Sequence, residues 1–198
     1  TLTPSLTAVQ RRKLAAKISP TIRASLSVNS RTILRYDDGD DILAFLASES
    51  GKKLSQIGPA TPDHLIQTKR HPLWIEFPDF EDVTNISQII GEKAQEYSNK
   101  YEKWYRQFSN DSHPMLDPYP RVILMPGLGM WTTGKDSRAA LIAGDIYHHT
   151  ISVVSMSQSL SSYTSLTPVD AFEAEYWPME LYKLTLASPE KELASRVA

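Results

Sequence analysis

The sequence predicts an α/β fold, a layered sandwich in which a small, mostly buried sheet is flanked by helices. Short apolar stretches typical of strands alternate with longer stretches whose apolar residues recur every three or four positions, as on one helix face. Of the 198 residues, 41% are hydrophobic and 22% are charged. This is the composition of an ordinary globular protein that can bury a core without crosslinks.

The first 30 residues are predicted to be an N-terminal helical segment. The stretch SLTAVQRRKLAAKI is a helix candidate. Ser19 followed by Pro20 has the pattern of a helix cap with proline at the first helical position. We therefore expect two helices that meet at a sharp corner near Pro20.

An α/β domain is predicted over residues 31–187, and it opens with a strand. RTILRY (31–36) reads as that strand, DDGD as a turn, and DILAFLAS as a helix with its apolar residues on one face. A strand followed by an amphipathic helix begins the alternation on which the fold class depends.

A short helix and a second strand come next. Thr61 can cap this helix, Pro62 suits its first position, and Pro72 ends it after about two turns. LWIEF (73–77) alternates apolar and polar positions, which favours a strand.

The longest helix is predicted over residues 86–108, and its apolar face is unusually aromatic. This face holds Ile86, Ile90, Tyr97, Tyr101, Trp104 and Phe108. Such a stripe can stack bases or sugars, but no basic cluster adjoins it in the sequence. Packing against a sheet or a partner subunit is therefore the favoured interpretation.

The last part of the domain contains two apolar stretches and two helices. RVILMPG (121–127) reads as a buried strand, and LGMWTTG (128–134) can extend it or pair with it across the Pro-Gly turn. Residues 137–160 alternate as a helix. A further helix is expected over 167–187, bent or interrupted at Pro178.

The stretch GMWTTGKD (129–136) is one residue away from the phosphate-binding signature G-x-x-x-x-G-K-[ST]. Asp136 replaces the magnesium-binding hydroxyl, and the bulky or β-branched residues between the glycines favour extended backbone over a loop. We therefore predict a strand, a turn at Gly134, a helix cap at Asp136 and no nucleoside triphosphate binding. The same helix start, with Lys135, remains a candidate site for a small phosphate or carboxylate.

The short helix carries the most site-like cluster of the chain. A hydroxyl, an acid, an imidazole and two cations fall within about 15 Å of helix. These residues are Thr61, Asp63, His64, Lys69 and Arg70. Helix capping accounts for Thr61 and Asp63 without a ligand, so a binding site here is a hypothesis.

Several kinds of chemistry have no support in the sequence. There is no cysteine, no histidine pair with zinc-ligand spacing, and no glycine-flanked serine. The 21 basic residues are spread along the chain and outnumbered by 23 acids, which argues against a nucleic-acid partner. No apolar run could span a membrane and no signal peptide is recognisable, so a cytoplasmic protein is expected.

Four blocks of sequence carry a family resemblance. They are GPATPDHLIQTKRHPLW, DPYPRVILMPGLGMWTTGKD, LSSY and FEAEYWPMELYKL. In this order they resemble the region after the zinc-site portion of bifunctional rhamnulose-1-phosphate aldolase/alcohol dehydrogenases, in which a class II aldolase/adducin-like part precedes a short-chain dehydrogenase. The resemblance covers most of the chain from about Arg31 onward and implies a class II aldolase-like fold.

The resemblance also implies what the parent protein does. It would use zinc and NAD to cleave a ketose 1-phosphate into dihydroxyacetone phosphate and an aldehyde, and then to oxidise the aldehyde. The zinc-binding pair and catalytic glutamate of the family have no counterpart here, so we expect neither a catalytic residue nor a cofactor in this chain. ASRVA resembles the first strand of the dehydrogenase, so residues 188–198 are predicted to be a linker into that domain.

Two partners are expected from the resemblance: the rest of the same polypeptide and further copies in a homo-oligomer. The alternative function is a non-catalytic spacer or oligomerisation module between catalytic domains. Its contact surface would be the aromatic helix from Tyr97 to Phe108.

Overall fold

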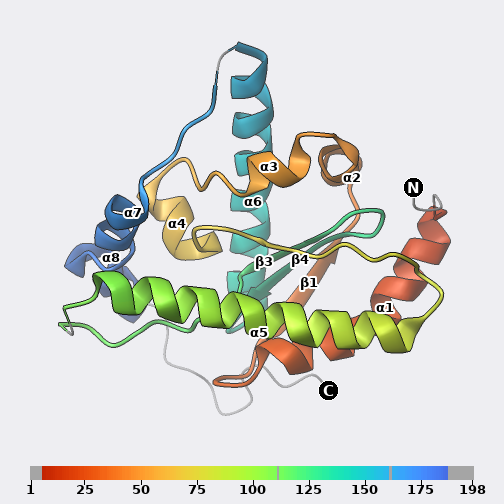
Figure 1. The fold of residues 1–198 in the computed structure, drawn as a ribbon, viewed down its shortest axis with the longest axis horizontal. Helices are drawn as coiled ribbons and strands as arrows, with labels where there is room; N and C mark the ends of the chain where they lie inside the picture. Colours follow the sequence, from red (N-terminus) through yellow and green to blue (C-terminus); the bar gives the residue numbers. More distant parts are fainter. Residues whose placement is uncertain (1–5, 111, 161, 187–198) are drawn as a thin grey trace.

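The computed structural model describes residues 6–110, 112–160 and 162–186, and it contains one four-stranded mixed sheet (Figure 1). The strands are β1 (Ile33–Asp37), β2 (Leu73–Trp74), β3 (Val122–Met125) and β4 (Gly129–Gly134), in the order β1-β4-β3-β2. β4 is antiparallel to both neighbours, and β2 is parallel to β3. The predicted linker at 188–198 lies outside the described residues.

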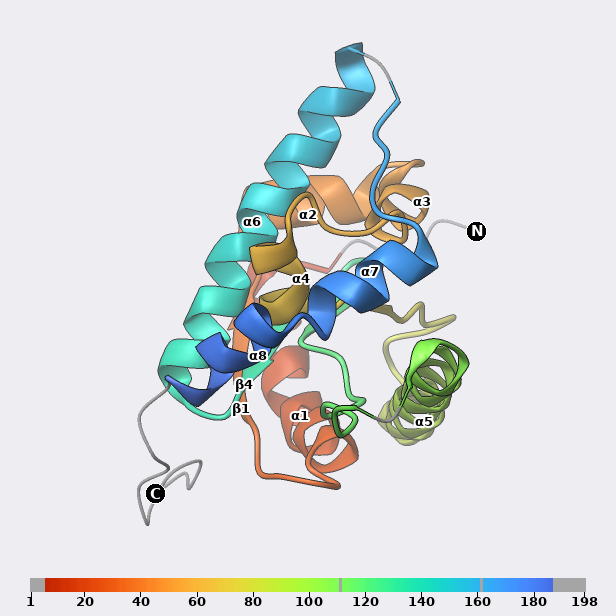
Figure 2. The same cartoon turned by 90° about the vertical axis from the view of Figure 1, so that its left-hand side faces the viewer.

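Helices cover both faces of the sheet. They are α1 (Ala8–Leu26), α2 (Asp40–Ala47), α3 (Gly51–Ser55), α4 (Pro62–Thr68), α5 (Val83–Phe108), α6 (Ser137–Leu160), α7 (Pro168–Glu175) and α8 (Pro178–Thr185). Figure 2 shows the sheet between α6 on one side and α1 with α5 on the other. The predicted layered α/β sandwich is confirmed.

Alternation along β3 and β4 divides the core into two parts. Ile123 and Trp131 face α1 and α5, whereas Leu124 and Met130 face α2 and α6. All of these side chains are fully buried, because successive residues of a strand point to opposite faces and both faces are covered. The bulky residues of GMWTTG are therefore core residues.

The predicted corner at Pro20 is wrong, because α1 runs through it as one helix. Ala15, Ile18 and Ile22 lie buried on one face, on both sides of the proline. Their burial offsets the roughly 3 kcal/mol that proline costs inside a helix. The N-terminal helical segment thus packs into the same core as the α/β domain.

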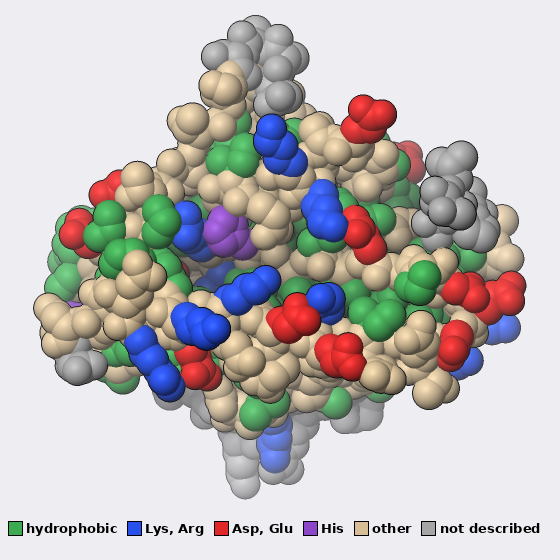
Figure 3. Space-filling view, viewed as in Figure 1, with side chains coloured by type: hydrophobic (Ala, Val, Ile, Leu, Met, Phe, Trp, Pro, Cys, Tyr) green, Lys and Arg blue, Asp and Glu red, His purple; other side chains and the backbone are tan. Residues whose placement is uncertain are grey.

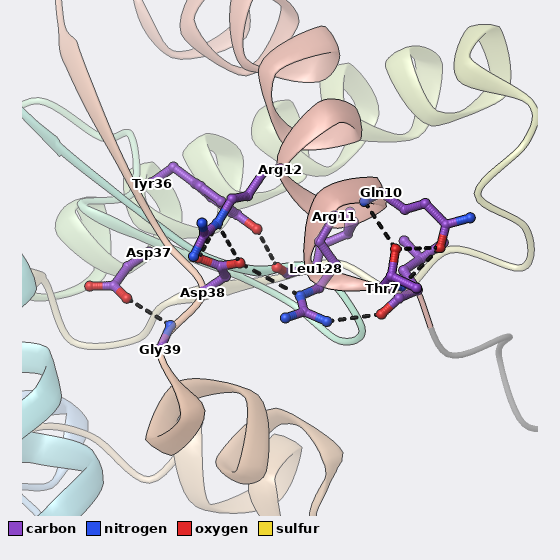
Figure 4. Close-up of polar contacts among 10 residues, drawn as sticks. Thr7, Gln10, Arg11, Arg12, Tyr36, Asp37, Asp38, Gly39 and Leu128 are labelled. Atoms are coloured by element: carbon purple, nitrogen blue, oxygen red, sulfur yellow. Dashed lines mark hydrogen bonds and ion pairs between the residues drawn. The ribbon is translucent and has the colours of Figure 1, made fainter.

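Polar contacts also hold the start of α1 against the end of β1 (Figure 4). Arg12 Nε lies 3.2 Å from Asp38 Oδ2, and Arg11 Nε lies 3.7 Å from the same oxygen. Tyr36 Oη donates to the carbonyl oxygen of Leu128 at 2.7 Å, which ties β1 to the turn between β3 and β4. These contacts lie beside the turn that joins β3 to β4.

The remaining strands and helices agree with the predictions from the sequence, with small differences. The strand predicted over 73–77 pairs with β3 only at residues 73–74, followed by one more backbone hydrogen bond from Ile75. The helix expected over 167–187 is divided into α7 and α8 at Pro178, as the proline predicted. Within the described residues, no helix is long and apolar enough to cross a membrane.

Candidate functional site

Two stretches that the sequence singled out separately border one cavity of about 480 Å³. We name it the α6 cavity, because the end of β4 and the first turn of α6 form its floor. Ile66 and Gln67 of α4 form one wall, and α8 forms another. Its charged lining residues are Arg121, Lys135, Asp136, Arg138 and Lys183.

Gly134 and Asp136 shape the floor of the α6 cavity. A Cβ at Gly134 would lie 2.4 Å from the backbone nitrogen of Ala140, so only glycine lets β4 approach the first turn of α6 this closely. Gly134 ends the strand without a positive φ, which corrects the prediction that it supplies a turn. Asp136 Oδ1 accepts from Ala139 N at 2.8 Å, which confirms the predicted cap.

The α6 cavity carries a surplus of positive charge. Four cationic side chains face one carboxylate, and that carboxylate is already bonded to the helix backbone. Lys183 is paired with Asp63 at 2.7 Å and with Glu180 at 2.6 Å, so the surplus comes chiefly from Arg121 and Arg138. The first turn of a helix adds unpaired N–H groups and the positive end of its dipole. Such a cavity suits a small dianion.

The predicted residues of the α4 helix serve mainly to hold it in place. Thr61 Oγ1 accepts from His64 N at 3.2 Å, and Asp63 pairs with Lys183 of α8. The ring of His64 packs edge-on against His149 of α6, with 5.4 Å between centroids. Burial, followed by the charge of His149, lowers the pKa of His64. These three residues fix α4, α6 and α8 around the cavity without lining it.

Lys69, another predicted ligand-binding residue, lies in a closed interior cluster. Its side chain is 4% exposed, its Nζ lies 2.9 Å from Glu175 Oε1, and it also sits 4.1 Å from the Tyr101 ring centroid. Tyr101 Oη donates to the same Glu175 oxygen at 2.7 Å. Burial lowers the pKa of Lys69 against the opposing effect of Glu175. Lys69 thus joins the end of α4 to α5 and α7.

Sequence reasoning missed three lining cations of the α6 cavity: Arg121, Arg138 and Lys183. The hairpin contained a signal for the first, because pairing of β3 with β4 places Arg121 beside the end of β4. Thr133 N donates to Arg121 O at 2.9 Å. Lys183 had no such signal, since only the packing of α8 on α4 brings it to the cavity.

No metal centre is assembled in the described part of the chain. It contains no group of three or more His, Cys, Asp or Glu side chains that could hold a metal ion. His148 illustrates why, because both of its ring nitrogens already contact carboxylates: Asp41 at 2.6 Å and Asp37 at 3.1 Å. Burial opposes protonation of this ring, but hydrogen bonds to the two aspartates outweigh it and raise the His148 pKa. The residues described here therefore do not fit a zinc ion.

A buried mixed sheet between two helical layers makes this a layered α/β domain. Residues 13–184 match the family model described as aldolase class II, second domain, and the chain belongs to this family. The chain is also 40% identical over 190 residues to an uncharacterized oxidoreductase, YuxG, of Bacillus subtilis (strain 168). That match covers 96% of the chain but only 28% of the relative.

Two solved structures share the fold. One is YgbL, a putative aldolase/epimerase/decarboxylase from Escherichia coli, with a TM-score of 0.54 and 13% identity over 82% of this chain and 65% of that chain. The other is an aldolase II superfamily protein from Pseudomonas syringae, with a TM-score of 0.52 and 12% identity over 91% of this chain and 62% of that chain. The predicted class II aldolase-like fold is confirmed.

Proposed function

We propose that the chain is the phosphate-binding second domain of a bifunctional sugar-phosphate enzyme. The parent reaction would be retro-aldol cleavage of a ketose 1-phosphate into dihydroxyacetone phosphate and an aldehyde, followed by oxidation of the aldehyde. Membership of the class II aldolase family and similarity to part of an oxidoreductase support this proposal. The zinc and NAD that such reactions use would be held by other parts of the parent polypeptide.

The observation that carries the proposal is the surplus of positive charge in the α6 cavity. Arg121 and Arg138 can each present two N–H groups to phosphate oxygens, and Lys135 lies beside them in the lining. Apolar side chains of α4, α6 and α8 line the rest of the cavity, which would strengthen these charged contacts. The domain would hold the phosphate end of the sugar while the reacting carbons lie at the remaining aldolase portion.

Titration of the chain with dihydroxyacetone phosphate and with inorganic phosphate tests the proposal. We expect measurable heat and a higher melting temperature with both ligands. Arg138→Gln should weaken binding about tenfold, because a charge-assisted contact is lost from an exposed side chain. The matched control is Arg106→Gln on α5, away from the cavity. Absence of both heat and a melting shift at millimolar ligand would overturn the proposal.

The alternative, a spacer or oligomerisation module, is favoured by exposed apolar side chains on α8 rather than by the predicted aromatic face of α5. The aromatic face of α5 is only partly available for a contact between chains, because Trp104 and Phe108 pack against Phe172 of α7 in the same chain. A contact between chains would instead use the outer face of α8, where Met179 and Tyr182 are each 56% exposed. Light scattering across a range of concentrations tests this alternative, since a strictly monomeric chain would contradict it.

A further inference from the structure

The aromatic face of α5 borders a second hollow, a groove of about 580 Å³ between α5, α3 and the segment around β2. We name it the α5 groove. Figure 3 shows this face, where a hollow lies above the long helix. The hollow contains a histidine side chain and has basic side chains around it. Among the described residues, the lining of the α5 groove shares no member with that of the α6 cavity.

Three aromatic rings of the α5 groove are held in fixed positions by their polar atoms. Tyr97 Oη donates to a backbone carbonyl oxygen at 2.7 Å, and Trp104 Nε1 donates to another at 3.0 Å. Trp74 Nε1 donates to a glutamate oxygen at 2.9 Å. Each ring is half-buried, so part of its apolar surface faces the groove. Rings fixed in this way lose little conformational entropy when a flat ligand stacks on them.

Folding supplies the basic cluster that the sequence did not show beside the aromatic stripe. Lys52 from α3 and Arg70 from the end of α4 reach the groove, where Lys93 and Lys100 of α5 also lie. Lys52 and Lys93 are each paired with a glutamate at 2.8 Å. Arg70 and Lys100 hold no ion pair within the described residues, so their charges are open to an anionic ligand.

The polar groups of the α5 groove favour a flat base over a polyhydroxylated sugar. Sugar hydroxyls are usually recognised by carboxylates and amides, but the carboxylates and the amide of this groove already bind other groups of the protein. Glu76 and Glu96 bind the two lysines, and Gln56 Nε2 donates to a backbone carbonyl oxygen at 3.2 Å. The groups that remain for a ligand are the ring surfaces, the two cations and the unpartnered Nδ1 of His71. We propose that the α5 groove binds a nucleoside phosphate, with its base on the aromatic rings and its phosphate near Arg70 and Lys100.

Calorimetric titration at low salt with AMP, ribose 5-phosphate and inorganic phosphate tests this proposal. AMP should bind about tenfold or more tightly than ribose 5-phosphate, because only AMP has a base to stack. Lys100→Gln should weaken AMP binding about threefold, whereas Lys103→Gln, on the same helix outside the groove, should leave it unchanged. Trp74→Leu should reduce the preference for AMP over ribose 5-phosphate in a chain that still melts cooperatively.

Three results would overturn the proposal: no AMP binding at millimolar concentration, equal affinity for AMP and ribose 5-phosphate, or equal effects of the two lysine substitutions. The proposal is independent of the sugar-phosphate function. Arg138→Gln should weaken dihydroxyacetone phosphate binding in the α6 cavity without changing AMP affinity. Failure of one proposal can therefore be distinguished from failure of the other.

Discussion

Removal of the charge at Glu175 should destabilise the fold strongly at neutral pH and much less at alkaline pH. Glu175 is 1% exposed and faces Lys69, which is 4% exposed, so Glu175→Gln leaves a buried ammonium without its counterion. The alternative for the folded chain is to release the Lys69 proton. From an unfolded pKa of 10.5, that release costs at most about 5 kcal/mol at pH 7 and about 2 kcal/mol at pH 9.

The sign of this pH dependence follows from proton binding. The folded variant binds fewer protons at Lys69 than the unfolded chain does, so its stability rises with pH below 10.5. The loss relative to wild type should therefore be about 3 to 5 kcal/mol at pH 7 and shrink by pH 9. The double variant Lys69→Met/Glu175→Gln has no buried charge and should lie within about 2 kcal/mol of wild type at both pH values.

Urea unfolding followed by circular dichroism at pH 7 and pH 9 measures these differences. A loss below about 1 kcal/mol at pH 7 would show that Lys69 and Glu175 are not coupled as the geometry indicates. A loss that is the same at both pH values would show that an uncompensated Lys69 charge is not its cause. Equal instability of the single and double variants would contradict the reasoning in the same way.

Three further predictions concern the backbone and a histidine. Gly134→Ala should lower the free energy of unfolding by about 1 to 3 kcal/mol, because its Cβ meets backbone at 2.4 Å. Gly91→Ala, within α5, should raise it by about 0.5 to 1 kcal/mol, because its Cβ would meet only Ser25 Oγ at 4.0 Å. Urea unfolding midpoints measure both changes. Pro20→Ala should stabilise the fold by about 1 to 2 kcal/mol and raise the melting temperature, because an exposed position of α1 regains a backbone hydrogen bond. A lower melting temperature would contradict this. Because the pKa of His148 is raised, protonated His148 stabilises the fold fully below about pH 6.5, and this stabilisation is lost as pH rises through the folded pKa. Unfolding of His148→Gln between pH 5 and pH 9 should not show this loss of stability, whereas the control His113→Gln should still show it.

Local patterns were enough to predict most of the secondary structure. Residues 137–160 alternate with a helical period, and α6 has these bounds. The break at Pro178 was predictable because proline excludes the preceding helical conformation. Pro20 was misjudged by the same rule, since a local pattern does not contain the packing of Ile18 and Ile22 against α5 that keeps α1 continuous. Tertiary burial decides between the two prolines.

The candidate site was less predictable than the fold, because charges gather there from distant parts of the chain. Lys135 and Gly134 belong to one recognisable stretch, and both lie at the α6 cavity. The sequence could not show the surroundings of Lys69, because its partner Glu175 is 106 residues away. Lys183 reaches the cavity through a contact with Asp63 across 120 residues. Local sequence cannot report such pairs.

The near-match GMWTTGKD shows how the burial of a strand determines the kind of anion site that can form beside it. A phosphate-binding loop uses consecutive backbone N–H groups, but those of β4 are committed to pairing with β1 and β3. Trp131 and Met130 must also point into opposite halves of the core. An anion at the α6 cavity would therefore depend on side-chain cations, chiefly Arg121 and Arg138. Its affinity should fall steeply with added salt, as charge contacts near a surface do, whereas a site built from backbone N–H groups would be less sensitive.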